Sequence, residues 1–330
     1  MTSYSIPLFL SLSLSLSLLP LLQSELTRDY YQKTCPKFSH IVNSTVTAKQ
    51  LAAPTTAAAT LQLFFHDCMV GGCDASILVT SNSYNKAERD AEVNVHLSGD
   101  AFDAVARAKA ALEMECPGVA SCADILATAA AHLVAAVGGP AVEVPLGRKD
   151  SVESKSSSAE KQFPLATMAM SEIISIFSRK GFSVGEMVAL GGAHTIGLSH
   201  CKEFSKRIFE FREGSEVDPA YNPGYAEGLR KLCANYTKDP SMSAFNDVMT
   251  PTKFDNVYFK NLRRGLGLLA SDSAMFGDPR TRPFVDTYAN DQTKFFQDFS
   301  LALSKLSSLQ VKTGSLGEVR TRCDSFNSLP

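Results

Sequence analysis

The sequence predicts a mainly α-helical protein. In many segments apolar residues recur every three or four positions, the period of a helix that packs one face on a core. Capping residues such as Ser121 precede several of these segments. Strand-like alternation is scarce and limited to short pieces such as residues 142–144. With 330 residues, 45% of them hydrophobic, the chain can form one large domain or two fused ones.

Four helices are predicted in the first half of the chain. In the second of them, Leu61, Phe64 and Phe65 follow helical spacing, and Thr55 or Thr56 is the expected cap. The fourth is apolar on nearly all sides, so we expect it to be a central buried helix. Glycine pairs follow the second and the fourth helix and end them. The four expected ranges are 35–50, 55–68, 100–115 and 121–137.

The second half begins after a polar segment. Residues 151–161 are rich in Ser, Lys and Glu and are interpreted as an exposed loop, a candidate boundary between the two halves. Residues 218–224 are rich in turn-forming types. Helical spacing predicts helices over residues 167–179, 183–190, 204–211, 254–264, 282–289 and 291–306.

Charge excludes two classes of partner. The formal net charge is -2 and the sequence pI is about 6.3. This balance gives no electrostatic basis for nucleic-acid binding, and no polybasic run favours a membrane surface. We therefore expect neither nucleic acid nor membrane among the partners of the mature chain.

The N-terminus has the pattern of a secretory signal peptide. Residues 6–22 are almost entirely Leu and Ser, no charged side chain precedes Glu25, and the small Ser24 suits a cleavage point. A membrane anchor is the alternative, which the short apolar run disfavours. We expect a signal peptide over residues 1–24 and a mature chain over residues 25–330.

The cysteines predict disulfide bonds. Eight cysteines follow a secretory signal, and an even number in an oxidising compartment favours pairing. Eight cysteines allow 105 pairings, so their number alone leaves the connectivity open. Zinc is the competing interpretation, but the chain has no Cys-x2-Cys pair. Asn43 and Asn235 begin glycosylation sequons, in keeping with secretion.

The stretch QLFFHDCMVGGCDAS, residues 62–76, concentrates chemically active residue types. Gln62 and His66 lie four apart, so a helix places them on one face. Asp67, Asp74 and Ser76 offer oxygen ligands within ten residues, and loop carbonyls can add more, which suits Ca²⁺. A loop with solvated aspartates is the simpler alternative.

A second histidine, His194 in GGAHTIG, is the natural counterpart of His66. Flanking glycines let a bulky ligand approach the backbone closely. Asp247, Thr250 and Asp255 could form another oxygen site with Thr195. The remaining histidines are interpreted as structural residues; they are His40, His96, His132 and His200.

The ordered motifs identify a family resemblance. FFHDCMVGGCDAS, ERD, ASCAD, GGPAVEVPLGRKDS, VALGGAHTIGLSHC, TPTKFDNVYF, GLLASD and the terminal RTRC occur in the order typical of class III secretory plant peroxidases. The resemblance spans residues 25–323. It implies a single catalytic domain over residues 25–330, with a two-lobed, mainly α fold and one haem b between the lobes.

The resemblance also implies roles for individual residues. His194 would bind the haem iron and Asp272 would hydrogen-bond it, which makes the imidazole more basic. His66 would be the distal acid and base, and Asn94 would accept its other proton with support from Glu88. Two further roles are implied: Phe65 would wall off the distal face, and Pro164 would meet aromatic substrates.

Two structural calcium ions and four disulfides are implied by the same resemblance. The distal ion would use Asp67, Val70, Gly72, Asp74 and Ser76, with Glu88 assigned to the same site. The proximal ion would use Thr195, Asp247, Thr250, Lys253 and Asp255. The implied disulfides are Cys35–Cys116, Cys68–Cys73, Cys122–Cys323 and Cys201–Cys233.

The chain departs from the family pattern at Gln62, where the family has arginine. Glutamine donates a hydrogen bond but is neutral, so we expect slowed peroxide activation. Thr55 also stands where some relatives have an arginine near a haem propionate. Met69 and Gly71 differ from the commonest loop residues, with little expected effect because only carbonyls are needed there.

The implied function is a secreted, extracellular haem peroxidase of the cell wall. It would reduce H₂O₂ and oxidise small phenolic donors in one-electron steps, as a monomer. The alternative from another class is a secreted haem- and calcium-binding wall protein with little turnover, which Gln62 favours. A non-haem hydrolase is disfavoured because no G-x-S-x-G elbow is present.

Overall fold

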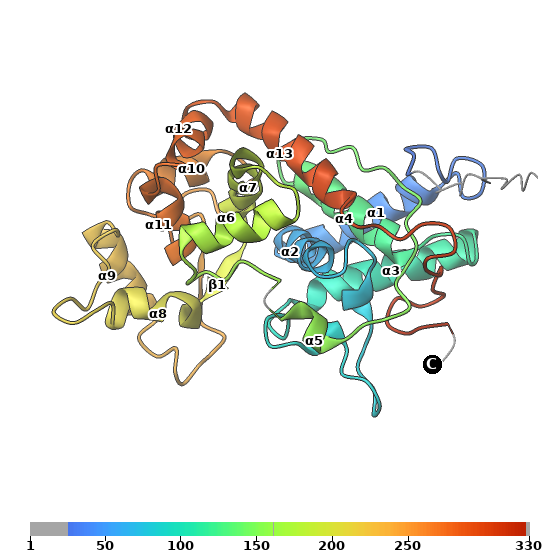
Figure 1. The fold of residues 1–330 in the computed structure, drawn as a ribbon, viewed down its shortest axis with the longest axis horizontal. Coiled ribbons are helices and arrows are strands. Elements are labelled where there is room, and N and C mark those ends of the chain that lie inside the picture. The colour runs from blue at the N-terminus through green and yellow to red at the C-terminus, as the bar shows by residue number, and fades with distance from the viewer. Residues whose placement is uncertain (1–25, 161, 328–330) are drawn as a thin grey trace, which may run out of the picture.

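The structure is a computed structural model that describes residues 26–160 and 162–327 (Figure 1). The predicted signal peptide, residues 1–24, lies outside the described residues. No helix in the described ranges is both long and apolar enough to cross a membrane.

The described residues are mainly helical, as predicted. Helices are α1 (Phe38–Ala52), α2 (Thr56–Met69), α3 (Gly99–Glu115), α4 (Cys122–Ala136), α5 (Ser156–Ala159), α6 (Met170–Arg179), α7 (Val184–Gly191), α8 (Cys201–Phe209), α9 (Pro223–Leu232), α10 (Val257–Leu262), α11 (Ala270–Gly277), α12 (Arg282–Asn290) and α13 (Gln292–Ser307). Short 3₁₀ turns are Ser76–Leu78, Glu88–Asp90 and Gly192–Thr195. Strands β1 (Leu198–His200) and β2 (Ser243–Phe245) pair antiparallel, with Leu198 opposite Phe245.

Figure 1 shows an elongated molecule with helices gathered in two groups. Helices α1, α3 and α4 lie on one side, α8 to α12 on the other, and α2 lies between them. Helix α13 runs along one edge, packs on α7 and also contacts α2. Helix α2 is therefore placed where residues from both groups can reach its open face.

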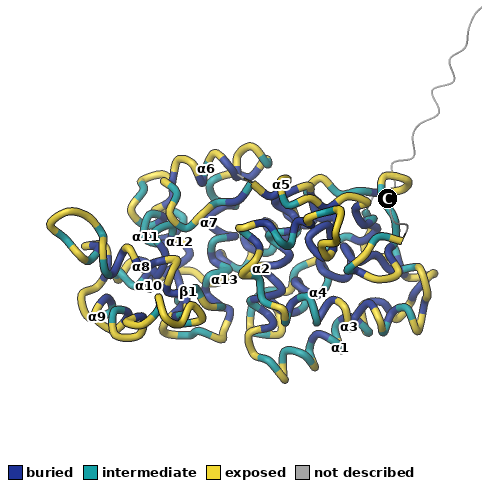
Figure 2. The backbone as a smooth tube through the Cα atoms, turned by 90° about the horizontal axis from the view of Figure 1, so that it is seen from below, coloured by how far each residue is buried: buried dark blue, intermediate teal, exposed yellow. Residues whose placement is uncertain are grey.

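Helix α4 is the central buried helix that the sequence predicts. Ile125, Leu126 and Leu133 are almost fully buried, and α4 packs against α1, α2 and α3. The Ser121 hydroxyl accepts a hydrogen bond from the Asp124 amide at 3.2 Å, as expected of an N-cap. Figure 2 shows buried backbone running through both groups of helices, with exposed segments mostly at loops.

Two sequence-based expectations about elements were wrong, and two helices were missed. Thr55 stands at the cap position of α2, but its hydroxyl donates to Asp100 Oδ2 at 3.4 Å instead of capping the helix. Residues 151–161 are not a wholly exposed loop, because they include α5 and the buried Ser151, Ser154 and Ala159. Helices α9 and α11 were not predicted at all.

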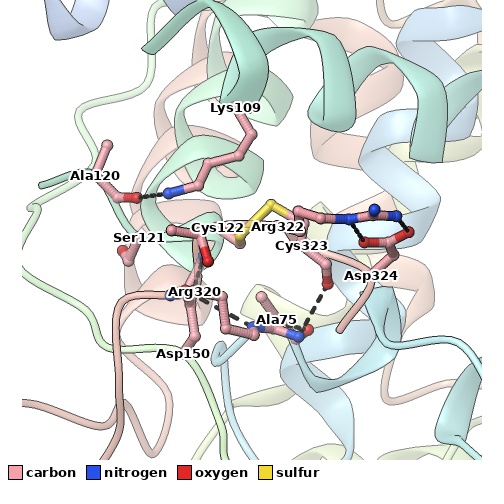
Figure 3. The surroundings of a disulfide bond; sticks show 12 residues. Ala75, Lys109, Ala120, Ser121, Cys122, Asp150, Arg320, Arg322, Cys323 and Asp324 are labelled. Atoms are coloured by element: carbon pink, nitrogen blue, oxygen red, sulfur yellow. Dashed lines mark hydrogen bonds and ion pairs between the residues drawn. A yellow bond between two sulfur atoms is a disulfide. The ribbon is translucent and has the colours of Figure 1, made fainter. Parts of the chain in front are cut away.

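The described cysteines form four disulfides with the pairing that the resemblance implies: Cys35–Cys116, Cys68–Cys73, Cys122–Cys323 and Cys201–Cys233. The Cys122–Cys323 bond joins the start of α4 to the C-terminal segment (Figure 3). Beside it the buried Arg320 guanidinium donates to the Cys323 carbonyl at 3.0 Å and to the Ala75 carbonyl at 2.6 Å. The C-terminal segment is thereby tied to the loop that carries Asp74 and Ser76.

Candidate active site

The open face of α2 carries the distal residues. Gln62 is exposed, and Phe65 and His66 are half-buried, whereas their neighbours Leu63, Phe64 and Asp67 are buried. Gln62 and His66 lie one turn apart, so both side chains leave the helix toward the same volume. The structure therefore places Gln62 and His66 on one surface, as their spacing predicts.

His66 is held by an amide. Its Nδ1 lies 2.8 Å from Asn94 Oδ1, and Asn94 Nδ2 donates to the Glu88 carbonyl oxygen at 2.8 Å. Because the amide nitrogen is committed to Glu88, its oxygen must accept, so His66 Nδ1 carries the proton. The other ring nitrogen, Nε2, is left with a free lone pair. Glu88 supports this arrangement through its backbone.

The protein keeps the His66 imidazole neutral. Burial lowers its pKa to about 4, and the hydrogen bond to Asn94 opposes this only in part. Desolvation penalises the imidazolium, so the ring is a neutral base at ordinary pH. A neutral imidazole with one fixed N–H can take a proton at Nε2 and return it.

Phe163 completes the surroundings of His66. Its ring stacks on the imidazole, with centroids 4.4 Å apart and planes inclined by 27°, and the side chain is buried. It directly precedes Pro164, the predicted substrate contact, which is half-buried. The sequence analysis missed Phe163, and only its position beside Pro164 could have indicated it.

His194 lies on the 3₁₀ turn that follows α7 and is held by a carboxylate. Its Nδ1 donates to Asp272 Oδ1 at 2.8 Å, and Asp272 is fully buried at the start of α11. Burial lowers the pKa of His194, but the charge and hydrogen bond of Asp272 outweigh it, so the pKa is raised overall. With Nδ1 occupied, His194 Nε2 is the nitrogen available to a metal.

A second partner of Asp272 was not predicted. The Tyr258 hydroxyl donates to the same Oδ1 at 2.8 Å, and the backbone amide of Leu269 donates to Oδ2 at 3.0 Å. Tyr258 comes from α10 and lies 14 residues before Asp272, so no local spacing indicated the contact.

Buried carboxylates gather in the distal loop. Asp67, Asp74 and Glu88 are all buried, and the Ser76 hydroxyl donates to Glu88 Oε2 at 3.0 Å. Burial, followed by the charges of Asp74 and Glu88, raises the pKa of Asp67 well above its usual range. Burial likewise raises the pKa of Glu88 to about 8. Lys312 forms an ion pair with Asp74, the one cation that contacts this set among the described residues.

The proximal oxygen set also comes together. The Thr250 hydroxyl lies 3.2 Å from Asp247 Oδ2 and 3.1 Å from Asp255 Oδ1. The Thr195 hydroxyl lies 3.4 Å from the Lys253 carbonyl and accepts from the Asp255 amide at 3.4 Å. All five predicted proximal residues are thus linked by contacts, and one of them, Thr195, directly follows His194 in the chain.

Neither set is a cluster of acidic side chains alone. In the described part of the chain, no three His, Cys, Asp or Glu side chains are grouped closely enough to hold a metal by themselves. A calcium ion at either place would draw on hydroxyl and carbonyl oxygens as well, as hard cations commonly do. In the distal loop, Val70 and Gly72 would supply such carbonyls.

Both histidines keep an accessible part of the ring, which fits the binding of a cofactor. The His194 side chain is 38% exposed although its partner Asp272 is fully buried, so the ring is held on its Nδ1 side and keeps an accessible part. The His66 ring is likewise half-buried, although its pKa is shifted in the opposite direction, downward. Six residues after His194, His200 has a buried Nδ1 with no hydrogen-bond partner among the described residues. An added polar group would satisfy that nitrogen.

The two sequons differ in their surroundings. Asn43 lies inside α1, and its side-chain Oδ1 is buried without a partner among the described residues. Asn235 is exposed and follows the end of α9. Accessibility therefore favours Asn235 over Asn43 as a glycan acceptor.

Residues 42–291 match the sequence profile of the family described as "Peroxidase". The chain belongs to the peroxidase family, and its fold and its two supported histidines agree with that membership. It is a peroxidase of the class III plant type, an oxidoreductase that uses haem, H₂O₂ and a reducing substrate.

Three relatives from Arabidopsis thaliana illustrate the similarity. Peroxidase 41 is 59% identical over 304 residues, which cover 92% of each chain. Peroxidase 65 is 58% identical over 304 residues, 92% of this chain and 90% of its own. Peroxidase 63 is 55% identical over 305 residues, 92% of each chain.

Proposed function

We propose that this chain is a secreted peroxidase that reduces H₂O₂ and oxidises small phenolic donors in one-electron steps. One observation carries the proposal. Two histidines from different parts of the chain each have Nδ1 engaged, His66 by the Asn94 amide and His194 by the Asp272 carboxylate. Each therefore presents Nε2, one as a proton carrier and the other as a metal ligand.

His66 performs the acid–base chemistry. Its neutral Nε2 takes a proton from H₂O₂ and returns it to the departing oxygen as water forms, so one group serves both transfers. Asn94 keeps the proton on Nδ1 and so keeps Nε2 available. Phe163 stacks on the ring and limits its rotation.

His194 holds the haem iron in this proposal. Haem, when bound, supplies the redox-active iron that exchanges electrons with peroxide and with donors. The Asp272 carboxylate orients the imidazole and makes it a stronger ligand. His200, with its unpartnered Nδ1, is available to a polar group of the same cofactor.

Gln62 is proposed to replace the distal arginine as a neutral hydrogen-bond donor. It is exposed on the same face as His66, so its amide can reach a bound peroxide. Without a positive charge it stabilises the developing negative oxygen less. Peroxide activation is therefore slowed but still catalysed through His66.

Two calcium ions are proposed to bind next to the two histidines and to stabilise their positions. The distal set adjoins His66 through Asp67, and the proximal set adjoins His194 through Thr195. The raised pKa values of Asp67 and Glu88 are those of buried carboxyls that lack a full counter-charge, which a divalent cation would supply. Loss of either ion would loosen the adjacent histidine.

Phenolic donors are proposed to approach along Pro164. Pro164 follows Phe163, which contacts His66 directly, so a donor at Pro164 would lie near the distal side. A phenol-oxidation assay with purified holoprotein tests the proposed function. Peroxide-dependent oxidation of a simple methoxyphenol is expected, and none at saturating haem and peroxide would contradict it.

The proposed location is the extracellular space, with cleavage after Ser24 and a monomeric mature domain over residues 25–330. The four disulfides support an oxidising compartment. The exposed sequon at Asn235 supports glycosylation there. N-terminal sequencing of secreted protein and its mass before and after glycosidase treatment test these statements.

Gln62 also favours a second candidate function, that of a secreted haem- and calcium-binding wall protein with little turnover. The same assay separates the two. Under this alternative the haem-loaded protein would oxidise phenols no faster than its His66→Ala variant.

A further inference from the structure

One oxygen of the Asp272 carboxylate, which supports His194, accepts hydrogen bonds from two donors. Asp272 Oδ1 accepts from His194 Nδ1 and from the Tyr258 hydroxyl, each at 2.8 Å. The other oxygen, Oδ2, accepts from the Leu269 amide at 3.0 Å. Asp272 and Tyr258 are both fully buried, so no bulk water competes for these oxygens.

We propose that Tyr258 is a positioning residue that limits how strongly Asp272 accepts the His194 proton. In doing so, Tyr258 would help to set the reduction potential of the iron that His194 binds. The inference rests on the proposed function, because it takes His194 as the iron ligand.

Competition at one oxygen gives the direction of the effect. A hydrogen bond from Tyr258 draws negative charge from Oδ1, so less remains to attract the His194 Nδ1 proton. When that hydrogen bond is removed, Oδ1 becomes the stronger acceptor and His194 gains imidazolate character. A more electron-rich imidazole stabilises ferric over ferrous iron.

Aromatic packing holds the Tyr258 hydroxyl in this position. The Tyr258 ring meets the His194 ring edge to face, with centroids 6.1 Å apart and planes at 88°. The Tyr258 ring also packs on the Phe259 ring, with centroids 5.1 Å apart. Because the Tyr258 side chain is fully buried, bulk water does not compete with Asp272 for its hydroxyl.

The test compares two buried tyrosines that each donate to a carboxylate. Tyr258→Phe removes the hydrogen bond to Asp272, and Tyr288→Phe removes the one from Tyr288 to Asp298 Oδ2, which is 2.9 Å long. Both variants lose one hydroxyl from a tyrosine that is at most 1% exposed, so a general packing effect would appear in both. Haem-loaded protein is used throughout.

Two readouts other than activity are measured: the ferric–ferrous midpoint potential by spectroelectrochemistry, and the iron–histidine stretch of ferrous protein by resonance Raman. Tyr258→Phe is expected to shift the equilibrium toward ferric iron by about fivefold, or roughly 40 mV at 59 mV per tenfold. The stretching frequency should rise. Tyr288→Phe should change neither.

Two results would overturn the inference. If Tyr258→Phe matches Tyr288→Phe in both readouts, Tyr258 does not act on Asp272. If the potential rises and the frequency falls, Tyr258 holds Asp272 in place instead of weakening it as an acceptor. Failure of the proposed function would look different, since the unmodified protein would then bind no haem or show no iron–histidine stretch.

Discussion

Gln62 lies one turn before His66 on the exposed face of α2, where a positive charge would face bound peroxide. Gln62→Arg should raise the second-order rate constant for reaction with H₂O₂ by about 10²-fold, because one preorganised donor near developing charge is typically worth 10²–10³. Stopped-flow absorbance of the haem-loaded protein measures this constant. Gln62→Leu serves as the matched control and should be slower than the unmodified protein. If Gln62→Arg reacts no faster than the unmodified protein, the neutral Gln62 does not slow peroxide activation.

Protonation of His66 should set the lower pH limit of the reaction with H₂O₂. Its folded pKa of about 4 lies below the ordinary value of 6.5, because burial disfavours the imidazolium. The ring therefore stays neutral, and able to take a proton, at every pH above about 4. The rate constant for H₂O₂ should be flat from pH 8 to pH 5 and fall about tenfold per unit below pH 4. A break near pH 6.5 would show that His66 titrates like a solvated histidine.

At the scale of the elements, the distal loop between α2 and the 3₁₀ turn Ser76–Leu78 is tightly constrained at Gly72. Gly72 has φ +105°, and a Cβ there would lie 2.3 Å from the Gln310 carbonyl oxygen. Gly72→Ala should therefore destabilise the protein by about 1–3 kcal/mol from backbone strain, and the steric clash should add to this value. The substitution should also weaken calcium binding at the proposed distal site. Thermal unfolding with excess calcium and after chelation measures both effects.

Gly71→Ala is the matched control for this loop. A Cβ at Gly71 meets nothing closer than Asp74 Oδ2 at 3.6 Å, so its stability should change by less than about 0.5 kcal/mol. If both alanine variants unfold at the same temperature as the unmodified protein, the loop is not held against Gln310 as described.

How far the sequence could predict an element depended on whether its signal was local. Helix α4 was predicted with its cap because Ser121 and an apolar run stand side by side in the chain. Helix α9 was missed because Gly224 and Gly228 interrupt it, although Asn222 and Pro223 form a recognisable start. Strands β1 and β2 were missed because each has three residues and its partner is remote in sequence.

The residues of the candidate site divide in the same way, into those with a local signal in the sequence and those without one. Gln62 and His66 follow from helical spacing, and the roles of Asn94 and Asp272 came from the family resemblance. Phe163 and Tyr258 could be found only in the folded chain, because their contacts with His66 and Asp272 join segments that no periodic pattern relates.

At the scale of the whole molecule, the Cys122–Cys323 bond closes the largest loop, with a sequence separation of 201. In the chain-entropy model its loss should lower the free energy of unfolding by about 5 kcal/mol, against about 4 for Cys201–Cys233, whose separation is 32. Urea unfolding of the two double Cys→Ser variants gives both values. Equal or reversed losses would mean that local strain and packing outweigh loop closure.

The central claim is that one haem lies between His66 and His194, with different duties for the two imidazoles. The most direct measurement is the absorption spectrum of hemin-loaded protein before and after one equivalent of H₂O₂, for the unmodified chain and its His66→Ala and His194→Ala variants. The unmodified protein should show a Soret band that shifts with peroxide. His66→Ala should keep the band but respond about 10²–10⁴-fold more slowly, and His194→Ala should lose the spectrum of the histidine-ligated iron. A colourless unmodified protein, or a His66→Ala variant that responds at the full rate, would contradict the claim.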